Sequence, residues 1–278
     1  MVSQEQRRRQ LAREKFLRQQ QRRTAARRKT HARNAVVASV LGVIVVGSVV
    51  SYATGVFKND DKKANAGAEV SPSPSASKAP DPCKKAAAGK VKSLSWKKEP
   101  AITIDKSADY TMKMATTCGD IDIALKTAAA PHTVNSFNFL AAKGYFDHTK
   151  CHRLTTNGIY VLQCGDPTAL GTGTPGYTIP DENLKDTTLK GGVYPAGTVA
   201  MANQYDASTK KGRNTGGSQF FLVYQDSQLP ANYTPFGTIS KSGMKVLTKI
   251  AAAGESTGAG DGAPNATVVI NKMTVTKS

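Results

Sequence analysis

The chain has 278 residues, of which 38 are Lys or Arg and 20 are Asp or Glu, so its formal net charge is +18 at pH 7. Residues 1–34 hold twelve of the basic residues and only two acidic ones, a net charge of +10, which leaves +8 for the rest of the chain. This uneven distribution excludes a uniformly basic nucleic-acid-binding domain and indicates a basic tail on a mildly basic body.

An uncharged stretch follows the basic tail. No charged residue lies between Arg33 and Lys58, and residues 35–57 are long enough to cross a bilayer, which takes about 20 apolar residues. We expect a transmembrane helix here, because a buried helix of a soluble protein rarely lacks polar residues on every face. A cleaved signal peptide is the alternative, since residues 51–53 are Ser-Tyr-Ala, but the basic region is longer than a usual signal-peptide n-region.

The basic residues before this segment predict its orientation. Positive charge is retained on the cytoplasmic side of a membrane, so residues 1–34 are expected in the cytoplasm and the chain after residue 58 outside it. The arginine-rich tail could instead contact nucleic acid or anionic lipid. A topology signal is the simpler explanation, and we expect no nucleic-acid partner.

Composition divides the rest of the chain into a linker and a domain. Residues 58–95 include a Pro- and Ser-rich run at 71–82 without apolar periodicity, which is typical of an extended spacer. Over residues 96–278 short apolar runs alternate with Gly, Pro and Asn. A stretch of about 180 residues is a common size for a single domain.

The predicted elements of this domain are mostly strands. Apolar or alternating runs predict strands at residues 101–104, 110–116, 121–125, 151–154, 159–164, 197–203, 218–224, 235–239 and 267–275. Helical spacing predicts two helices, over residues 131–143 and 244–252, the first beginning with Pro131 and ending at Gly144. Many strands without βαβ alternation favour an antiparallel barrel or sandwich.

Three motifs follow one another in the second half of the chain. The first is His152-Arg153-Leu154, followed by Tyr-Val-Leu-Gln-Cys-Gly-Asp at residues 160–166. The second is Met-Ala-Asn at residues 201–203, and the third is Asn-Thr-Gly-Gly-Ser-Gln-Phe-Phe at residues 214–221, followed by Phe-Gly at 236–237. Together, in order and approximate spacing, they resemble the cyclophilins over about residues 108–278.

The resemblance implies a fold and an activity. Cyclophilins are mainly β proteins, closed eight-stranded antiparallel barrels capped by two α-helices, and they catalyse peptidyl-prolyl cis–trans isomerisation. The resemblance also implies proline-containing polypeptides as substrates and no cofactor. Together with the single-pass anchor expected from the uncharged stretch, it suggests a bacterial cell-membrane form of the family that assists folding of extracytoplasmic proteins. The four His residues show no metal-ligand spacing. A binding module for proline-containing segments without catalysis is the alternative, and the oligomeric state stays open, with a monomer expected.

Site residues are carried over position by position. Arg153 matches the catalytic arginine, and Gln163 matches the glutamine that hydrogen-bonds the arginine and the substrate. The implied substrate-binding residues are an apolar wall of Tyr160, Val161, Phe221 and Leu229, a strip of Ala202, Asn203 and Gln219 along the substrate backbone, and Tyr233 and Gln228, where many members have His and Trp.

The chain departs from the family pattern in two loops. The stretch from Arg153 to Gln163 is two residues longer than the common form. The loop between Asn203 and Asn214 is longer as well and contains three basic residues.

Outside this set of motifs, a lone arginine such as Arg153 would be interpreted as a solvated surface charge. Because Ser218 does not lie in a Gly-x-Ser-x-Gly sequence, a serine hydrolase is not expected.

The four cysteines favour disulfides in a domain outside the cytoplasm, and none lies in a metal-like Cys-x-x-Cys spacing. Three pairings are open, and we favour Cys151–Cys164 together with Cys83–Cys118. The first would cross the hairpin that carries the matched arginine and glutamine. In a flat hairpin its two sulfur atoms would point to opposite faces unless a bulge intervened.

Overall fold

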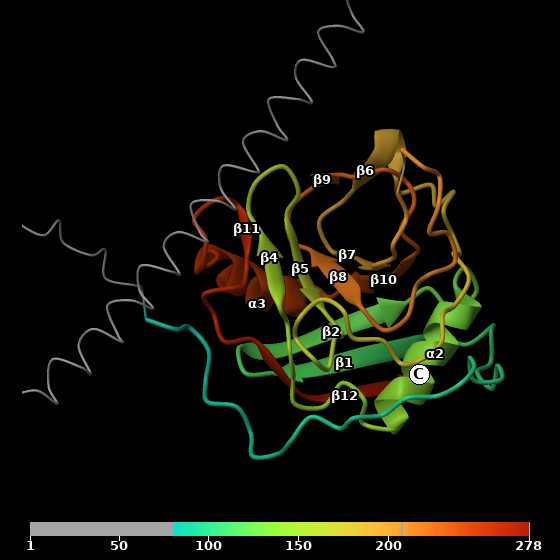
Figure 1. Ribbon diagram of the computed structural model, residues 1–278, viewed down its shortest axis with the longest axis horizontal. Helices are drawn as coiled ribbons and strands as arrows, with labels where there is room; N and C mark the ends of the chain where they lie inside the picture. Colours follow the sequence, from blue (N-terminus) through green and yellow to red (C-terminus); the bar gives the residue numbers. More distant parts are fainter. Residues whose placement is uncertain (1–79, 207, 278) are drawn as a thin grey trace, which may run out of the picture. The chain divides into compact units, whose positions relative to one another are not determined.

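The computed structural model describes residues 80–206 and 208–277, which form a β-rich domain (Figure 1). The predicted tail and transmembrane segment lie outside these residues. Within the described ranges, no helix is long and apolar enough to cross a membrane. The elements are β1 (Tyr110–Thr116), β2 (Gly119–Leu125), α2 (Pro131–Ala142), β3 (Thr149–Lys150), β4 (Arg153–Thr155), β5 (Val161–Cys164), the short 3₁₀ helix η1 (Lys190–Gly192), β6 (Val193–Tyr194), β7 (Thr198–Met201), β8 (Phe220–Val223), β9 (Ser227–Gln228), β10 (Pro235–Ile239), α3 (Lys241–Ala252), β11 (Asp261–Gly262) and β12 (Val269–Lys277).

Ten strands of the described domain form one antiparallel sheet in the order β11-β4-β5-β8-β7-β10-β2-β1-β12-β3, and β6 pairs with β9 separately. The sheet curls until its two ends approach each other. The N–H of Cys151 donates to the carbonyl of Val268, beside β12, whereas the N–H of the next residue, His152, donates to the carbonyl of Gln163 in β5. The predicted mainly β class with two helices is confirmed. The main sheet of the described residues has ten strands rather than the eight of the expected closed barrel, and both of its end strands, β3 and β11, have only two residues.

One predicted strand is wrong. Residues 101–104 form no strand. Instead, the N–H of Thr103 donates to Oδ1 of Asn135 on α2 at 2.9 Å, and Nδ2 of Asn135 donates to the carbonyls of Pro100 and Ala101 at 3.3 and 3.1 Å. The buried amide thus satisfies backbone groups that a strand would pair with a neighbouring strand.

Both predicted helices are present, and at each N-terminus a polar side chain satisfies N–H groups that have no partner within the helix. Helix α3 begins three residues earlier than predicted, because Oγ of Ser240 accepts from the N–H of Gly243 at 3.0 Å. Helix α2 has a remote cap. The carboxylate of Glu182 accepts from the N–H groups of His132 and Thr133 at 3.0 and 2.9 Å, where a negative charge also interacts favourably with the helix dipole.

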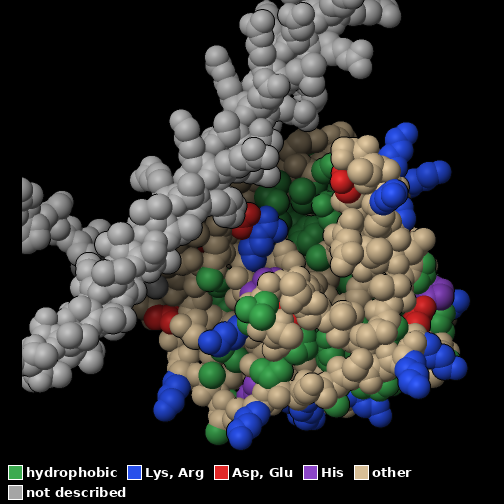
Figure 2. Space-filling view, viewed as in Figure 1, with side chains coloured by type: hydrophobic (Ala, Val, Ile, Leu, Met, Phe, Trp, Pro, Cys, Tyr) green, Lys and Arg blue, Asp and Glu red, His purple; other side chains and the backbone are tan. Residues whose placement is uncertain are grey.

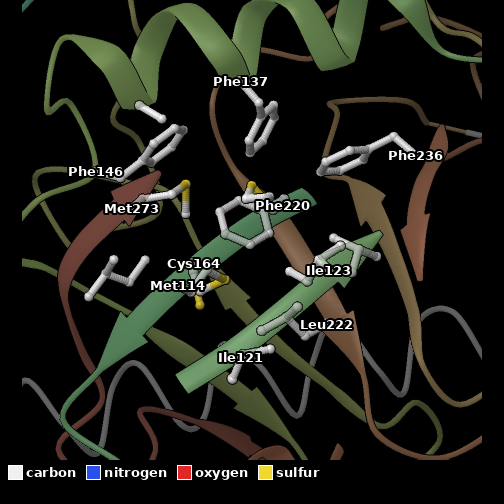
Figure 3. Close-up of a cluster of buried hydrophobic side chains, with 14 of the residues drawn as sticks. Met114, Ile121, Ile123, Phe137, Phe146, Cys164, Phe220, Leu222, Phe236 and Met273 are labelled. Carbon is white, nitrogen blue, oxygen red and sulfur yellow. The ribbon is translucent and has the colours of Figure 1, made fainter. Parts of the chain in front are cut away.

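The interior between α2 and the sheet is filled with aromatic rings (Figure 3). Phe137 of α2 stacks on Phe146 and meets Phe220 of β8 edge to face, in both cases with 5.3 Å between ring centroids. Phe236 of β10 lies 4.7 Å from Phe137. All four rings are fully buried. Because each ring removes a large apolar area from water, this cluster is a main source of stability for the domain.

Strands β5 and β8 carry apolar side chains on both faces of the sheet. Leu162, Phe220 and Leu222 belong to the interior core, whereas the alternating residues Val161 and Phe221 belong to a second apolar cluster. Successive side chains of a strand point to opposite faces, so the second cluster lies on the outer face of the sheet. All four residues of β8 are buried. This outer cluster forms the floor of the site described below.

Residues 80–95, predicted as part of the linker, lie along the domain (Figure 1). A disulfide joins Cys83 to Cys118 in the turn between β1 and β2, and the N–H of Lys84 donates to the carbonyl of Thr117 at 2.8 Å. The folded unit therefore begins before residue 96. A Pro- and Ser-rich composition indicates a spacer, but a covalent cross-link keeps this part of the chain on the domain.

Replacing both Cys83 and Cys118 with Ser is expected to lower the free energy of unfolding by about 2–4 kcal/mol, because the disulfide closes a long loop of the unfolded chain. The two cysteines are separated by 35 residues. Urea unfolding of the full-length protein in detergent, without reductant, measures the change. Limited proteolysis should then cut the variant within residues 80–95 faster than the wild type. Equal unfolding midpoints would mean that other contacts hold the segment.

Candidate active site

A pocket of about 220 Å³ opens on the outer face of β5, β7 and β8. It is lined by Arg153, Ile159, Val161, Gln163, Ala202, Asn203, Phe221, Leu229 and Tyr233. Figure 2 shows a hollow with hydrophobic side chains gathered in it and a basic group at its edge. The pocket thus combines an apolar floor with a guanidinium.

Arg153 and Gln163 lie opposite each other on the antiparallel strands β4 and β5. Their side chains therefore lie side by side on one face, and Nη1 of Arg153 donates to Oε1 of Gln163 at 3.2 Å. Nε2 of Gln163 donates to Oε1 of Gln219 at 2.9 Å, and Nε2 of Gln219 donates to the carbonyl of Gly173 at 3.0 Å. A continuous chain of hydrogen bonds therefore runs from the guanidinium across the sheet.

The opposite edge of the guanidinium is bound by Asp261. Nε and Nη2 of Arg153 donate to the two carboxylate oxygens, each at 2.7 Å. Hydrogen bonding to Arg153 lowers the pKa of Asp261, and hydrogen bonding to the carboxylate raises the pKa of Arg153. Both groups therefore stay charged at neutral pH. Asp261 is not among the residues predicted from the sequence, because it lies 108 positions from Arg153 and meets it only through the pairing of β11 with β4.

Aromatic side chains support the apolar floor. Phe221 meets Tyr233 edge to face, with 5.5 Å between ring centroids. Tyr194, which is fully buried, holds the backbone of Tyr233, because its hydroxyl donates to the carbonyl at 2.8 Å and accepts from the N–H at 3.1 Å. Burial raises the pKa of Tyr194 to about 12, so the hydroxyl keeps the proton that it donates. Tyr194 is a positioning residue that no sequence motif marks.

A second pocket of about 420 Å³ adjoins the first, and the two share Ala202 and Asn203. Gln219 lines the second pocket. Nδ2 of Asn203 donates to Oδ1 of Asp181 at 3.2 Å and to the carbonyl of Asn232 at 2.8 Å. The shared pair is therefore held in place between the two pockets.

Eight of the eleven predicted site residues line the first pocket, and their chemical roles stay predictions. The eight are Arg153, Val161, Gln163, Ala202, Asn203, Phe221, Leu229 and Tyr233. Gln219 does not line this pocket but contacts it through its hydrogen bond with Gln163. The sequence therefore predicted most of the pocket.

Tyr160 and Gln228 do not line either pocket. Tyr160 packs against Tyr224, with 5.9 Å between ring centroids, and Nε2 of the exposed Gln228 donates to the carbonyl of Gly191 at 2.8 Å. Ile159, which was not predicted, lines the pocket instead of Tyr160. The alternation of side chains along a strand was the missed signal, since residues 159, 161 and 163 share a face and residue 160 points away from it.

Both favoured disulfides are present, Cys83–Cys118 and Cys151–Cys164. Cys151 and Cys164 are buried and belong to the interior core, on the other face of the sheet from the pocket. The two sulfur atoms can meet because residues 151 and 152 fall between β3 and β4, where the regular alternation of side chains is interrupted. The disulfide therefore links the segment just before β4 to the end of β5, close to the arginine and the glutamine.

The side chains of the pocket limit the chemistry that it can perform. Its nine lining residues include no Ser, Thr, Cys, Lys, His, Asp or Glu, so they provide no carboxylate or imidazole base, and the hydroxyl of Tyr233 is their only nucleophilic group. Within the described residues, no group of three His, Cys, Asp or Glu side chains could hold a metal ion. The pocket offers apolar surface for a small ring and N–H donors at its edge. On a curled antiparallel sheet with two helices, this arrangement is the one that the resemblance to the cyclophilins implies.

Comparison of the sequence with known families agrees with this class. The family model described as cyclophilin type peptidyl-prolyl cis-trans isomerase matches residues 111–275. The chain therefore belongs to the cyclophilin-type peptidyl-prolyl cis–trans isomerases. The family name defines both the reaction and the substrates. The reaction is rotation about X–Pro bonds, and the substrates are peptides that contain such bonds.

Two mycobacterial relatives extend the similarity beyond the family model. The probable peptidyl-prolyl cis-trans isomerase B of Mycobacterium leprae is 46% identical over 217 residues, which cover 75% of this chain and 67% of the relative. The protein of the same name from Mycobacterium tuberculosis strain H37Rv is 43% identical over 218 residues, which cover 76% and 65%. The match thus spans about two thirds of each relative. Among solved structures, a cyclophilin type peptidyl-prolyl cis-trans isomerase from Cryptosporidium parvum has 25% sequence identity to this chain and a TM-score of 0.48. The aligned region covers 61% of this chain and 99% of the Cryptosporidium chain.

Tyr194→Phe is expected to weaken substrate binding, because it removes both hydrogen bonds to the backbone of Tyr233 and leaves two polar groups without their partner. Each such loss costs roughly 1–3 kcal/mol where the group stays buried. Peptide KM should rise several-fold. The matched control is Tyr110→Phe, which removes a hydroxyl that accepts from the N–H of Asp105 at 3.0 Å, outside the pocket lining. Comparable changes in KM for both variants would contradict the positioning role.

Proposed function

We propose that this protein accelerates cis–trans isomerisation of X–Pro bonds in polypeptides outside the cytoplasm, while a single N-terminal helix anchors it in the cell membrane. The observation that carries the proposal is the guanidinium of Arg153 at the edge of an apolar pocket, bound by Asp261 on one edge and by Gln163 on the other. The function includes assistance to the folding of exported proteins, since slow X–Pro isomerisation limits folding.

The reaction rotates a peptide bond and neither forms nor breaks a covalent bond, so its catalyst needs no nucleophile. Resonance gives the C–N bond of a peptide double-bond character, and rotation faces a barrier of about 18–20 kcal/mol. The cis and trans forms of an X–Pro bond differ by only about 0.5–1 kcal/mol. A catalyst therefore has to stabilise the twisted state, in which resonance is lost and the prolyl nitrogen becomes pyramidal and more basic.

The residues of the pocket suit this task. The outer apolar cluster, including Val161, Phe221 and Leu229, surrounds the proline ring, while Ala202 and Asn203 lie along the peptide towards the second pocket. The guanidinium then donates to the prolyl nitrogen of the twisted bond. Because this contact forms only as the bond twists, it lowers the barrier rather than merely tightening binding.

Two features support a location outside the cytoplasm. All four cysteines of the chain form disulfides, which persist mainly in oxidising compartments. The basic tail followed by 24 uncharged residues from Asn34 to Phe57 supports an anchor with its N-terminus in the cytoplasm.

Arg153→Ala is expected to lower kcat/KM by about 10²–10³, the scale for loss of one preorganised donor that stabilises charge in a transition state. Arg153→Lys should restore little, because an ammonium does not reproduce the planar group that binds Asp261 and Gln163 together. A protease-coupled peptide isomerisation assay on the full-length protein measures both variants. KM should change much less than kcat, since the apolar floor is intact.

The control for this experiment is Lys150→Ala, which removes an exposed cation three residues before Arg153 and should leave the rate unchanged. If folded Arg153→Ala isomerises at the wild-type rate, the catalytic role of the guanidinium is wrong. If the wild type binds proline-containing peptides without any turnover, the protein is a binding module.

Membrane topology is open to a direct test. Protease added to intact cells should release a fragment that contains the isomerase domain, while residues 1–34 stay protected. Antibodies against the tail and the domain identify the two products. Protection of the domain together with digestion of the tail would reverse the proposed orientation, and release of the domain without protease would indicate a cleaved signal peptide.

A further inference from the structure

Asp261 lies outside the three sequence motifs, on β11 between α3 and β12. Its two carboxylate oxygens accept from Nε and Nη2 of Arg153, each at 2.7 Å. A paired contact of this kind fixes the plane of the guanidinium as well as its position, which a single hydrogen bond does not.

The carboxylate binds the edge of the guanidinium that faces away from the pocket. Asp261 does not line the pocket, whereas Gln163, the acceptor for Nη1, does. A guanidinium has five N–H groups. Asp261 accepts two of them and Gln163 accepts one. The contacts among described residues thus leave one N–H on Nη1 and one on Nη2 for a bound peptide.

The loop that carries Asp261 is itself well ordered by hydrogen bonds. The carboxylate of Glu255, which is buried, accepts from the N–H and the hydroxyl of Thr257 at 2.6 and 2.7 Å and from the N–H of Gly260 at 2.9 Å. The carbonyl of Gly260 accepts from the N–H of Thr156 at 2.9 Å, and β11 pairs with β4. The loop is therefore hydrogen-bonded both to β4, the strand that carries Arg153, and to Thr156, the residue after that strand.

The longer hairpin between Arg153 and Gln163 provides the surface on which this loop packs. Asn157 lies in the hairpin. A Cβ atom added to Gly260 would clash with the side chain of Asn157. Gly260 also has a φ of +95°, which favours glycine. The extended hairpin and the loop thus fit closely at a position that requires glycine.

We propose that Asp261 is a positioning residue for the isomerisation, which orients the guanidinium of Arg153 so that its remaining N–H groups face the twisted X–Pro bond. The inference rests on the proposed function. An arginine side chain without this partner samples several rotamers, and a donor that is misplaced by about 1 Å can lose much of its effect on a rate. The side chains of the pair are 38% and 55% exposed, so the pair contributes little to folding. Its effect is therefore expected in turnover.

The experiment compares Asp261→Ala, Asp261→Asn and Asp261→Glu in the full-length protein, with kcat and KM measured separately for a peptide substrate. Asp261→Ala should lower kcat about 3–10-fold with KM changed less than about twofold. Asp261→Asn, which has the same shape without the charge, should fall between Ala and wild type. Asp261→Glu should restore more than half of the lost rate, because it keeps the carboxylate.

The matched control is Asp120→Ala. Asp120 forms an exposed ion pair with Lys113 at 2.7 Å, with side chains 51% and 50% exposed, and neither residue lines the pocket. This variant should keep the wild-type kcat, and its unfolding midpoint should match that of Asp261→Ala.

Several outcomes would overturn the inference. An Asp261→Ala variant as active as Asp120→Ala would show that Arg153 needs no such partner. An Asp261→Ala variant faster than the wild type would show that the carboxylate slows the reaction. If Asp261→Ala does not fold, Asp261→Asn decides, and a wild-type rate in that variant counts against the proposal. Absence of turnover in the wild type would instead overturn the proposed function itself, and this inference with it.

Discussion

The structure depends on a segment of sheet, β5, β7 and β8, that is packed on both of its faces. On the inner face, Phe220 and Leu222 join the aromatic core beneath α2. On the outer face, Val161 and Phe221 form the floor of the pocket. Because successive side chains alternate between the faces, the same strands supply the stability of the domain and the shape of its site. A backbone held from both sides moves little, so the pocket is preorganised by the core.

Polar groups of the site are arranged as one connected chain on this rigid support. Asp261, Arg153, Gln163 and Gln219 follow one another through hydrogen bonds of 2.7 to 3.2 Å. Each member is oriented by its neighbour, as preorganised electrostatic stabilisation requires. On the interior side, the Cys151–Cys164 disulfide joins the segment just before the strand of the arginine to the strand of the glutamine. The guanidinium of Arg153 is therefore positioned by covalent, hydrogen-bonded and packing contacts together.

Much of the fold was visible in the sequence, because strands and helices leave a local periodic pattern. Both helices and the longer strands were predicted within a few residues, whereas the two-residue strands are too short to show alternation. The strand predicted at 101–104 is absent because a distant side chain, Asn135, satisfies that backbone. In the site, alternation along the chain should have replaced Tyr160 with Ile159 as a lining residue. The favoured pairing of Cys83 with Cys118 already implied that part of the segment before residue 96 lies on the domain. The spacer-like composition of that segment obscured this consequence.

The sequence by itself determined the family, the arginine and glutamine that line the pocket, and most of its apolar wall, because these residues lie in three motifs that follow one another along a hairpin and its neighbouring strands. Arg153 and Gln163 are only ten residues apart and meet through local strand pairing. Only the tertiary structure decided which groups complete the site. Asp261 meets Arg153 across 108 residues, and Tyr194 holds Tyr233 across 39. Such contacts exist because the sheet curls and brings distant segments together, and no local pattern in a sequence encodes that curvature.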